Sequence, residues 1–164
     1  MFFSRRSCNV MAMIGCLVLI AVAYFYMENY LFLNPCPLCY AQRIVFAFLG
    51  LFFLLAAIFP GKTWGRKTHA VILLLTAAGG AALSIRHLYL QNLPKGQVPA
   101  CGQDFYALVQ NTPFAEAVKT MLTGTGDCAE VQWTMLGLSI PGWTLIAFIG
   151  FAIWGFVHNW FRVH

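Results

Sequence analysis

The stretch that decides the fold of this chain is NPCPLCYAQRIVFAFLGLFFLLAAIF, residues 34–59. Two cysteines, Cys36 and Cys39, lie near its start. Two prolines, Pro35 and Pro37, lie directly before and directly after Cys36. From residue 44 to residue 59 the stretch contains no polar or charged side chain. A backbone in lipid must satisfy its own hydrogen bonds, so this run predicts a membrane-spanning helix. The stretch therefore indicates a reactive sulfur pair at the edge of a membrane.

The composition of the whole chain is that of a membrane protein. Of its 164 residues, 60% are hydrophobic and 9% are charged, against about 45–50% and about 25% in soluble proteins. The length suits a single domain. The net charge is +5, but the basic residues form no dense patch interleaved with aromatic side chains. We therefore expect no nucleic-acid partner, and we expect the lipid bilayer to surround most of the chain.

Three further apolar runs, at 11–27, 70–85 and 141–157, resemble the one at 44–59. Each is slightly shorter than the roughly 20 residues that cross about 30 Å of hydrocarbon, and flanking Tyr, Trp and Arg side chains extend it. We predict an all-α integral membrane protein, a four-transmembrane-helix bundle. The predicted helices span about 10–31, 40–60, 69–91 and 141–160, with outer loops at about 32–39 and 92–140.

The first apolar run has a second interpretation as a cleaved signal peptide, with Arg5 and Arg6 as its positive flank. However, the run continues through three aromatic residues at 24–26 and lacks a clean small-x-small cleavage site. These features favour a retained helix.

The basic residues predict the orientation of the bundle. Arg5 and Arg6 precede the first helix. Lys62, Arg66 and Lys67 lie in the short connection between the second and third helices, and Arg162 lies near the end of the sequence. Positive residues stay on the cytoplasmic side, so both termini are expected there. The outer loops, with their four cysteines, then lie on the outer side of the membrane. In a bacterium that side is oxidising, and disulfides persist there.

The long outer loop contains the pattern of a short surface helix. Thr112 is suited to cap it, Pro113 to begin it and Gly124 to end it. Four apolar side chains then share one face of the helix: Phe114, Val118, Met121 and Leu122. We expect this amphipathic helix to lie on the membrane surface, and an ordinary packing helix is the alternative.

The pair Cys36 and Cys39 admits structural, zinc-binding and redox interpretations. A structural zinc site needs four ligands, and Cys101 and Cys128 lack the matching close spacing, so we expect no metal. Arg43 lies one helical turn beyond Cys39 and shares its face. A cation and a helix N-terminus both favour the thiolate form, which supports redox activity. Alternatively, Arg43 extends to lipid headgroups, as arginines at helix ends commonly do.

The other two outer cysteines, Cys101 and Cys128, flank the predicted surface helix among glycines and polar residues. A crosslink between them would contribute about 3 kcal/mol as a purely structural bond. An exposed pair together with one at the lipid edge also suggests a relay by thiol–disulfide exchange. Such a relay needs a final electron acceptor, for which a lipid-soluble quinone is suited. His87 and Gln91 share one helix face near the outer end and are candidates to contact it, unless lipid headgroups simply solvate them.

The ordered set of motifs resembles the DsbB family of bacterial inner-membrane disulfide bond formation proteins over nearly the whole chain. The shared segments are Cys-Pro-Leu-Cys with Gln42-Arg43, Arg86-His87-Leu88-Tyr89-Leu90-Gln91, Cys101, Gly126-Asp127-Cys128-Ala129-Glu130 with Gln132-Trp133, and Leu136-Gly137-Leu138. The spacing from Cys101 to Cys128 departs from the best-known pattern, so loop geometry is the least transferable feature.

The resemblance implies an enzyme that passes electrons from protein thiols to a quinone. A Cys101–Cys128 disulfide would accept electrons from a periplasmic DsbA-like thioredoxin-fold oxidase, and the pair Cys36–Cys39 would reoxidise it. Cys39 would meet ubiquinone, or menaquinone without oxygen, from the membrane quinone pool, with Arg43 stabilising charge. His87 and Gln91 would border the quinone. Two alternatives remain: a vitamin K epoxide reductase relative, whose motif order is reversed, and a non-catalytic membrane scaffold or transporter subunit.

Overall fold

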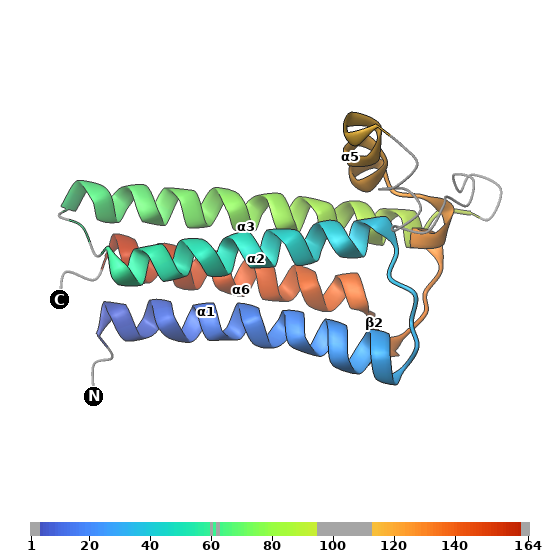
Figure 1. The fold of residues 1–164 in the computed structure, drawn as a ribbon, viewed down its shortest axis with the longest axis horizontal. Helices are drawn as coiled ribbons and strands as arrows, with labels where there is room; N and C mark the ends of the chain where they lie inside the picture. The colour runs from blue at the N-terminus through green and yellow to red at the C-terminus, as the bar shows by residue number, and fades with distance from the viewer. Residues whose placement is uncertain (1–3, 60, 62, 95–112, 162–164) are drawn as a thin grey trace.

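A computed structural model describes residues 4–59, 61, 63–94 and 113–161 of this protein. Its main elements are four long helical segments that lie side by side (Figure 1). They are α1 (Arg5–Ala21) continued by the π-helix η1 (Val22–Tyr30), then α2 (Pro37–Ile58), α3 (Thr63–Gln91) and α6 (Ile140–Trp160). Each segment is long and apolar enough to cross a membrane, which confirms the predicted multi-pass, four-helix membrane fold.

The helices of the bundle begin earlier than the apolar runs indicated. Helix α2 begins at Pro37, where about 40 was predicted, and α3 begins at Thr63, where about 69 was predicted. Apolar runs mark only the lipid-facing length of a helix, whereas its hydrogen-bond ladder continues through polar turns at each end. The earlier start of α2 places both cysteines of the C-x-x-C motif at the helix terminus.

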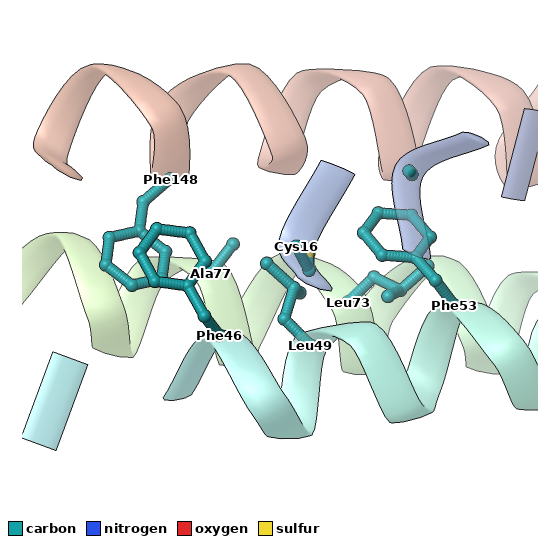
Figure 2. Packing of buried hydrophobic residues seen from close by; sticks show 8 residues of the cluster. Cys16, Phe46, Leu49, Phe53, Leu73, Ala77 and Phe148 are labelled. Carbon is teal, nitrogen blue, oxygen red and sulfur yellow. The ribbon is translucent and has the colours of Figure 1, made fainter. Parts of the chain in front are cut away.

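Aromatic side chains fill the centre of the bundle (Figure 2). The rings of Phe46 on α2 and Phe148 on α6 stack with their centroids 4.0 Å apart. Gly80 on α3 faces the same ring, and a Cβ atom at that position would lie 2.5 Å from Cζ of Phe148. The absence of a side chain at Gly80 therefore lets α3 and α6 approach closely at this point. The buried residues that complete this core are Ala12, Cys16, Leu49, Phe53, Leu73 and Ala77.

Short elements cover the end of the bundle at which α2 begins, here called the thiol end (Figure 1). Helix α5 (Phe114–Thr123) packs against α2 and ends at Gly124, whose φ of 78° suits glycine. The predicted cap, Thr112, lies outside the described residues. A single 3-10 turn, η2 (Gly126–Ala129), then packs against α3.

A two-stranded hairpin, β1 (Thr134–Met135) and β2 (Leu138–Ser139), leads into α6. Its two-residue loop has positive φ at both Leu136 and Gly137, as a type I′ turn requires. This hairpin was not predicted, although its glycine at the second loop position was a usable signal. It adds a local element to a fold that is otherwise helical.

Candidate functional site

The C-x-x-C motif lies where α2 begins at the thiol end of the bundle. Cys36 is the N-cap residue, Pro37 occupies the first helical position, and Cys39 follows within the first turn. The sulfur atoms of the two cysteines are 3.1 Å apart. Pro37 lacks an N–H that the first turn would leave unpaired in any case, so the motif starts the helix without loss of a hydrogen bond. Cys36 is buried and Cys39 is half-buried, so the pair has one sheltered and one accessible sulfur.

Cys128 lies directly beside this motif, although 92 positions separate it from Cys36 in the chain. The turn η2 brings its buried sulfur to within 4.8 Å of both the Cys36 sulfur and the His87 ring. Thr125 contacts the same sulfur, at 4.0 Å from its hydroxyl oxygen. Cys101 lies outside the described residues, so its predicted pairing with Cys128 stays a prediction.

Hydrogen bonds distribute charge unequally between these thiols. The Cys36 thiol donates to the Cys128 sulfur, and this hydrogen bond is the largest of the causes that together lower the pKa of Cys128 to about 6. Hydrogen bonds from the backbone N–H groups of Leu38, in the first turn of α2, and of Thr125 act in the same direction, whereas burial opposes them. The proximity of the Cys128 and Cys39 thiols, together with burial, raises the pKa of Cys36 far above its ordinary value. The helix N-terminus thus stabilises a thiolate at Cys128, whereas the sequence reasoning had placed that effect at the C-x-x-C pair.

Arg43 is held by the first membrane segment. Its guanidinium forms a 2.7 Å ion pair with Glu28 and donates a 3.0 Å hydrogen bond to the carbonyl oxygen of Ala23. The Tyr40 hydroxyl donates to the other carboxylate oxygen of Glu28, at 3.3 Å. Both partners of Arg43 belong to η1, and π-helical turns of this kind occur frequently at functional sites. These contacts direct Arg43 toward the protein rather than toward lipid headgroups.

A large apolar cavity of about 500 Å³ lies between η1, α2 and α6. Cys39 and Arg43 line it together with Gln42, and most of its other lining side chains are aliphatic or aromatic. Binding sites for small organic molecules are usually cavities of about 300–1,000 Å³ with few polar groups. The accessible sulfur of the C-x-x-C motif therefore faces a cavity of suitable size and polarity for an apolar ligand.

His87 and Gln91 lie on the other side of Cys39. The His87 ring has its Nε2 3.7 Å from the Cys36 sulfur and its Nδ1 3.4 Å from the side-chain nitrogen of Gln42. Gln91 accepts a 2.7 Å hydrogen bond from the hydroxyl of Ser139. Both residues line a small cavity of about 20 Å³ rather than the large one. The two cavities share four lining residues: Cys39, Gln132, Trp133 and Ile140.

Two buried or half-buried polar residues that the sequence reasoning missed support this site. Glu28 was detectable as a lone carboxylate at the outer end of an apolar run, where it needs a cationic partner. Gln42 connects His87 to a polar chain inside the bundle, because Thr144 donates to its side-chain oxygen at 2.9 Å and lies 3.2 Å from Ser84. No signal in the sequence indicated that these residues from three helices would meet.

Comparisons with known proteins agree on one family. The family model described as "Disulfide bond formation protein DsbB" matches residues 5–158. A protein of Hahella chejuensis named disulfide bond formation protein B is 55% identical over 139 residues, which are 84% of this chain and 83% of that protein. Proteins of the same name from Stutzerimonas stutzeri and Methylococcus capsulatus are 47% and 41% identical, covering 92% and 96% of this chain and 91% and 95% of their own lengths.

Proposed function

This chain belongs to the family of disulfide bond formation protein DsbB, and from that premise we propose that it carries electrons from a DsbA-like oxidase to a membrane quinone. Membership in the family identifies a disulfide-forming oxidoreductase of the membrane. It argues against a non-catalytic scaffold and against a vitamin K epoxide reductase relative. The DsbA-like partner and the quinone are the proposed parts.

The observation that carries this proposal is the position of the C-x-x-C pair between two partners. On one side, Cys36 is hydrogen-bonded to Cys128, the cysteine of the long loop. On the other side, Cys39 lines the large apolar cavity together with Arg43. A dithiol in this position can exchange with a protein disulfide at one sulfur and meet an apolar acceptor at the other.

The loop disulfide is the proposed entry point for electrons. A thiolate of the DsbA-like partner attacks Cys101 of a Cys101–Cys128 disulfide and forms a mixed disulfide with it, and Cys128 leaves with the electron pair of the broken bond. The second thiol of the partner later attacks its own sulfur in the mixed disulfide, which leaves the partner oxidised and releases Cys101 as a thiolate. A leaving thiol of low pKa leaves faster. While Cys36 is in a disulfide it has no proton to donate, so at this step the backbone N–H groups of Leu38 and Thr125 are what lower the pKa of Cys128.

Cys128 then acts as the nucleophile toward the membrane-edge pair. Its thiolate attacks Cys36 of a Cys36–Cys39 disulfide, forms a Cys36–Cys128 bond and releases Cys39 as a thiolate. The electron pair has then moved from the loop to the cavity. The closeness of the Cys128 and Cys36 sulfurs supports this direct step, because no loop movement is needed to bring the two into contact.

The large cavity fits a quinone. It is mostly apolar, and its polar lining residues include Gln42, Arg43, Gln132 and Thr144 in addition to Cys39. When bound, a quinone supplies an acceptor for two electrons and two protons. Arg43, fixed by Glu28, places a cation where the Cys39 thiolate and a reduced acceptor carry negative charge. We keep His87 and Gln91 as predicted neighbours of the acceptor, which they approach through the lining that the two cavities share.

The same proposal includes location and orientation. The thiol end faces the periplasm across a bacterial inner membrane, and both termini lie in the cytoplasm. The support is the basic residues near the termini and in the second connection, which include Arg5, Arg6, Arg66 and Lys67. A periplasmic thiol end also places the reactive sulfurs on the oxidising side.

Reconstitution of the purified protein tests the function. Reduced DsbA-like protein and ubiquinone are supplied, and quinone absorbance and partner thiols are followed together. We expect one quinone to be consumed for every two thiols lost. Cys39→Ser is expected to abolish quinone reduction, whereas Cys8→Ser, remote from the site, is the matched control. Correctly folded protein without this activity would refute the proposal.

A further inference from the structure

A second feature of the thiol end is a set of soft metal ligands that converge on one point. Cys36, His87 and Cys128 come from the start of α2, from α3 and from η2, and all three are buried. Their ligand atoms lie within 4.8 Å of one another. Spacing along the chain argued against a zinc site because Cys128 has no cysteine near it in sequence. The tertiary structure supplies the neighbours that the local sequence lacks.

The distances suit a tetrahedral ion. Zinc binds sulfur at about 2.3 Å and imidazole nitrogen at about 2.0–2.1 Å, so ligand atoms on one ion lie about 3.6–3.8 Å apart. The Cys36 sulfur and Nε2 of His87 are 3.7 Å apart. Cys39 is the nearest further thiol, since its sulfur is 3.1 Å from that of Cys36, but it is not one of the three residues whose ligand atoms converge. A turn of the Cys39 side chain that moves its sulfur about 0.7 Å farther from Cys36 and toward Cys128 and His87 would complete a set of three thiolates and one histidine.

The surroundings of His87 resemble those of a metal ligand. Metal-bound histidines usually engage their second ring nitrogen with a protein group, which fixes the orientation of the ring. Here the side-chain nitrogen of Gln42 faces Nδ1, and the Gln42 side-chain oxygen accepts a hydrogen bond from Thr144. Metal binding at Nε2 leaves the ring proton on Nδ1, so the Gln42 amide must turn to present its oxygen to that proton, which the Thr144 hydroxyl allows because it can also accept. His87 and Gln42 are each 3% exposed, so this contact lies inside the bundle. The ring is therefore held with Nε2 toward the sulfur atoms.

Space and access for a cation are also present. The small cavity of about 20 Å³ is lined by Cys36, Cys39 and His87. A cavity of this size holds about one water molecule or one ion. Two carboxylates, Asp127 and Glu130, line the same cavity and favour the approach of a cation over that of an anion.

We propose that the reduced protein binds one Zn²⁺ ion through Cys36, Cys128 and His87, with Cys39 as the fourth ligand. Binding requires thiolates, whereas a Cys36–Cys39 disulfide removes two ligands, so the oxidised protein does not hold the ion. Metal binding and disulfide exchange thus exclude one another, and Zn²⁺ inhibits turnover by holding the reduced form. The inhibition rests on the proposed function, but binding to the reduced thiols does not.

A metal titration without partner or quinone tests the site. The full chain in detergent micelles is reduced with a phosphine, freed of reductant and titrated first with Co²⁺ and then with Zn²⁺. We expect one Co²⁺ per chain, with thiolate charge-transfer absorption and the visible bands of tetrahedral cobalt, both removed by Zn²⁺. Protein with an oxidised Cys36–Cys39 pair should show neither signal. Equal binding by oxidised and reduced protein would mean adventitious metal only and would overturn the proposal.

Variants separate this site from other thiols. Cys128→Ser and His87→Gln should each lose the tetrahedral cobalt spectrum, while Cys101→Ser should retain it. Gln42→Leu should weaken Zn²⁺ binding by about 10- to 100-fold, as losses of groups that orient metal ligands do. Each variant is first checked for native helical content and a single size-exclusion peak. An unchanged spectrum in a folded Cys128→Ser or His87→Gln protein would refute the ligand set, whatever the outcome of quinone assays.

Discussion

The low pKa of Cys128 depends most on one neighbouring thiol, Cys36, and this dependence provides the sharpest test of the site. The hydrogen bond from Cys36 is the largest cause that moves the pKa of Cys128 from 9.0 to about 6. At pH 7, a thiol of pKa about 6 is about 90% ionised, whereas one of pKa about 9 is about 1% ionised. Cys36→Ala removes the donor and is expected to raise the pKa of Cys128 and lower its thiolate fraction severalfold.

The assay is a pH titration of thiolate ultraviolet absorbance in reduced protein. The background variant retains only Cys36 and Cys128, with serine at the other four cysteine positions. As pH rises through about 6, Cys128 is expected to lose its proton, while Cys36 stays protonated because its pKa is raised. In the Cys36→Ala protein the first ionisation should move to higher pH.

Cys36→Ser is the matched control, because its hydroxyl keeps a hydrogen-bond donor beside Cys128. Its midpoint should therefore stay closer to 6 than that of the alanine variant. A midpoint near 6 in the alanine variant would refute the assigned cause and leave the helix N-terminus as the main influence.

Three further predictions concern other parts of the molecule. Arg43→Gln removes the cation beside the large cavity and should raise the quinone concentration needed for half-maximal turnover; an unchanged quinone dependence would exclude Arg43 from the acceptor site. Cys101→Ser should abolish exchange with the DsbA-like partner but leave the C-x-x-C pair reactive with quinone, and equal loss of both reactions would contradict the relay. Gly80→Ala places a Cβ against the ring of Phe148 and should destabilise the bundle by about 1–3 kcal/mol, measured by thermal unfolding in detergent. Gly79→Ala, where no atom lies within 4 Å of the added Cβ, is its control, and equal melting temperatures would argue against the packing.

The parts of the fold that depend on local chemistry were predictable. Lipid forces each long apolar run into a helix, so four runs predicted four helices. Gly124 marked the end of α5 because glycine readily adopts the positive φ found there. The π-helical turn η1 was not predictable, because the apolar periodicity of its residues does not distinguish it from an α-helix. The hairpin before α6 was overlooked because each of its strands has only two residues.

The candidate site, like the fold, has features that could be predicted from the sequence and features that could not. The sequence by itself determined which residues are candidates for the chemistry, because a C-x-x-C motif at a helix start and an arginine one turn later are local features. Only the tertiary structure decided their partners. It places Glu28 on Arg43, and His87 between Cys36 and Gln42. It also directs the N–H groups at the start of α2 toward Cys128 rather than toward the C-x-x-C pair. The physical reason is that a pKa, an ion pair or a metal site depends on distances of 3 to 5 Å between atoms, and helix packing, not chain order, sets those distances.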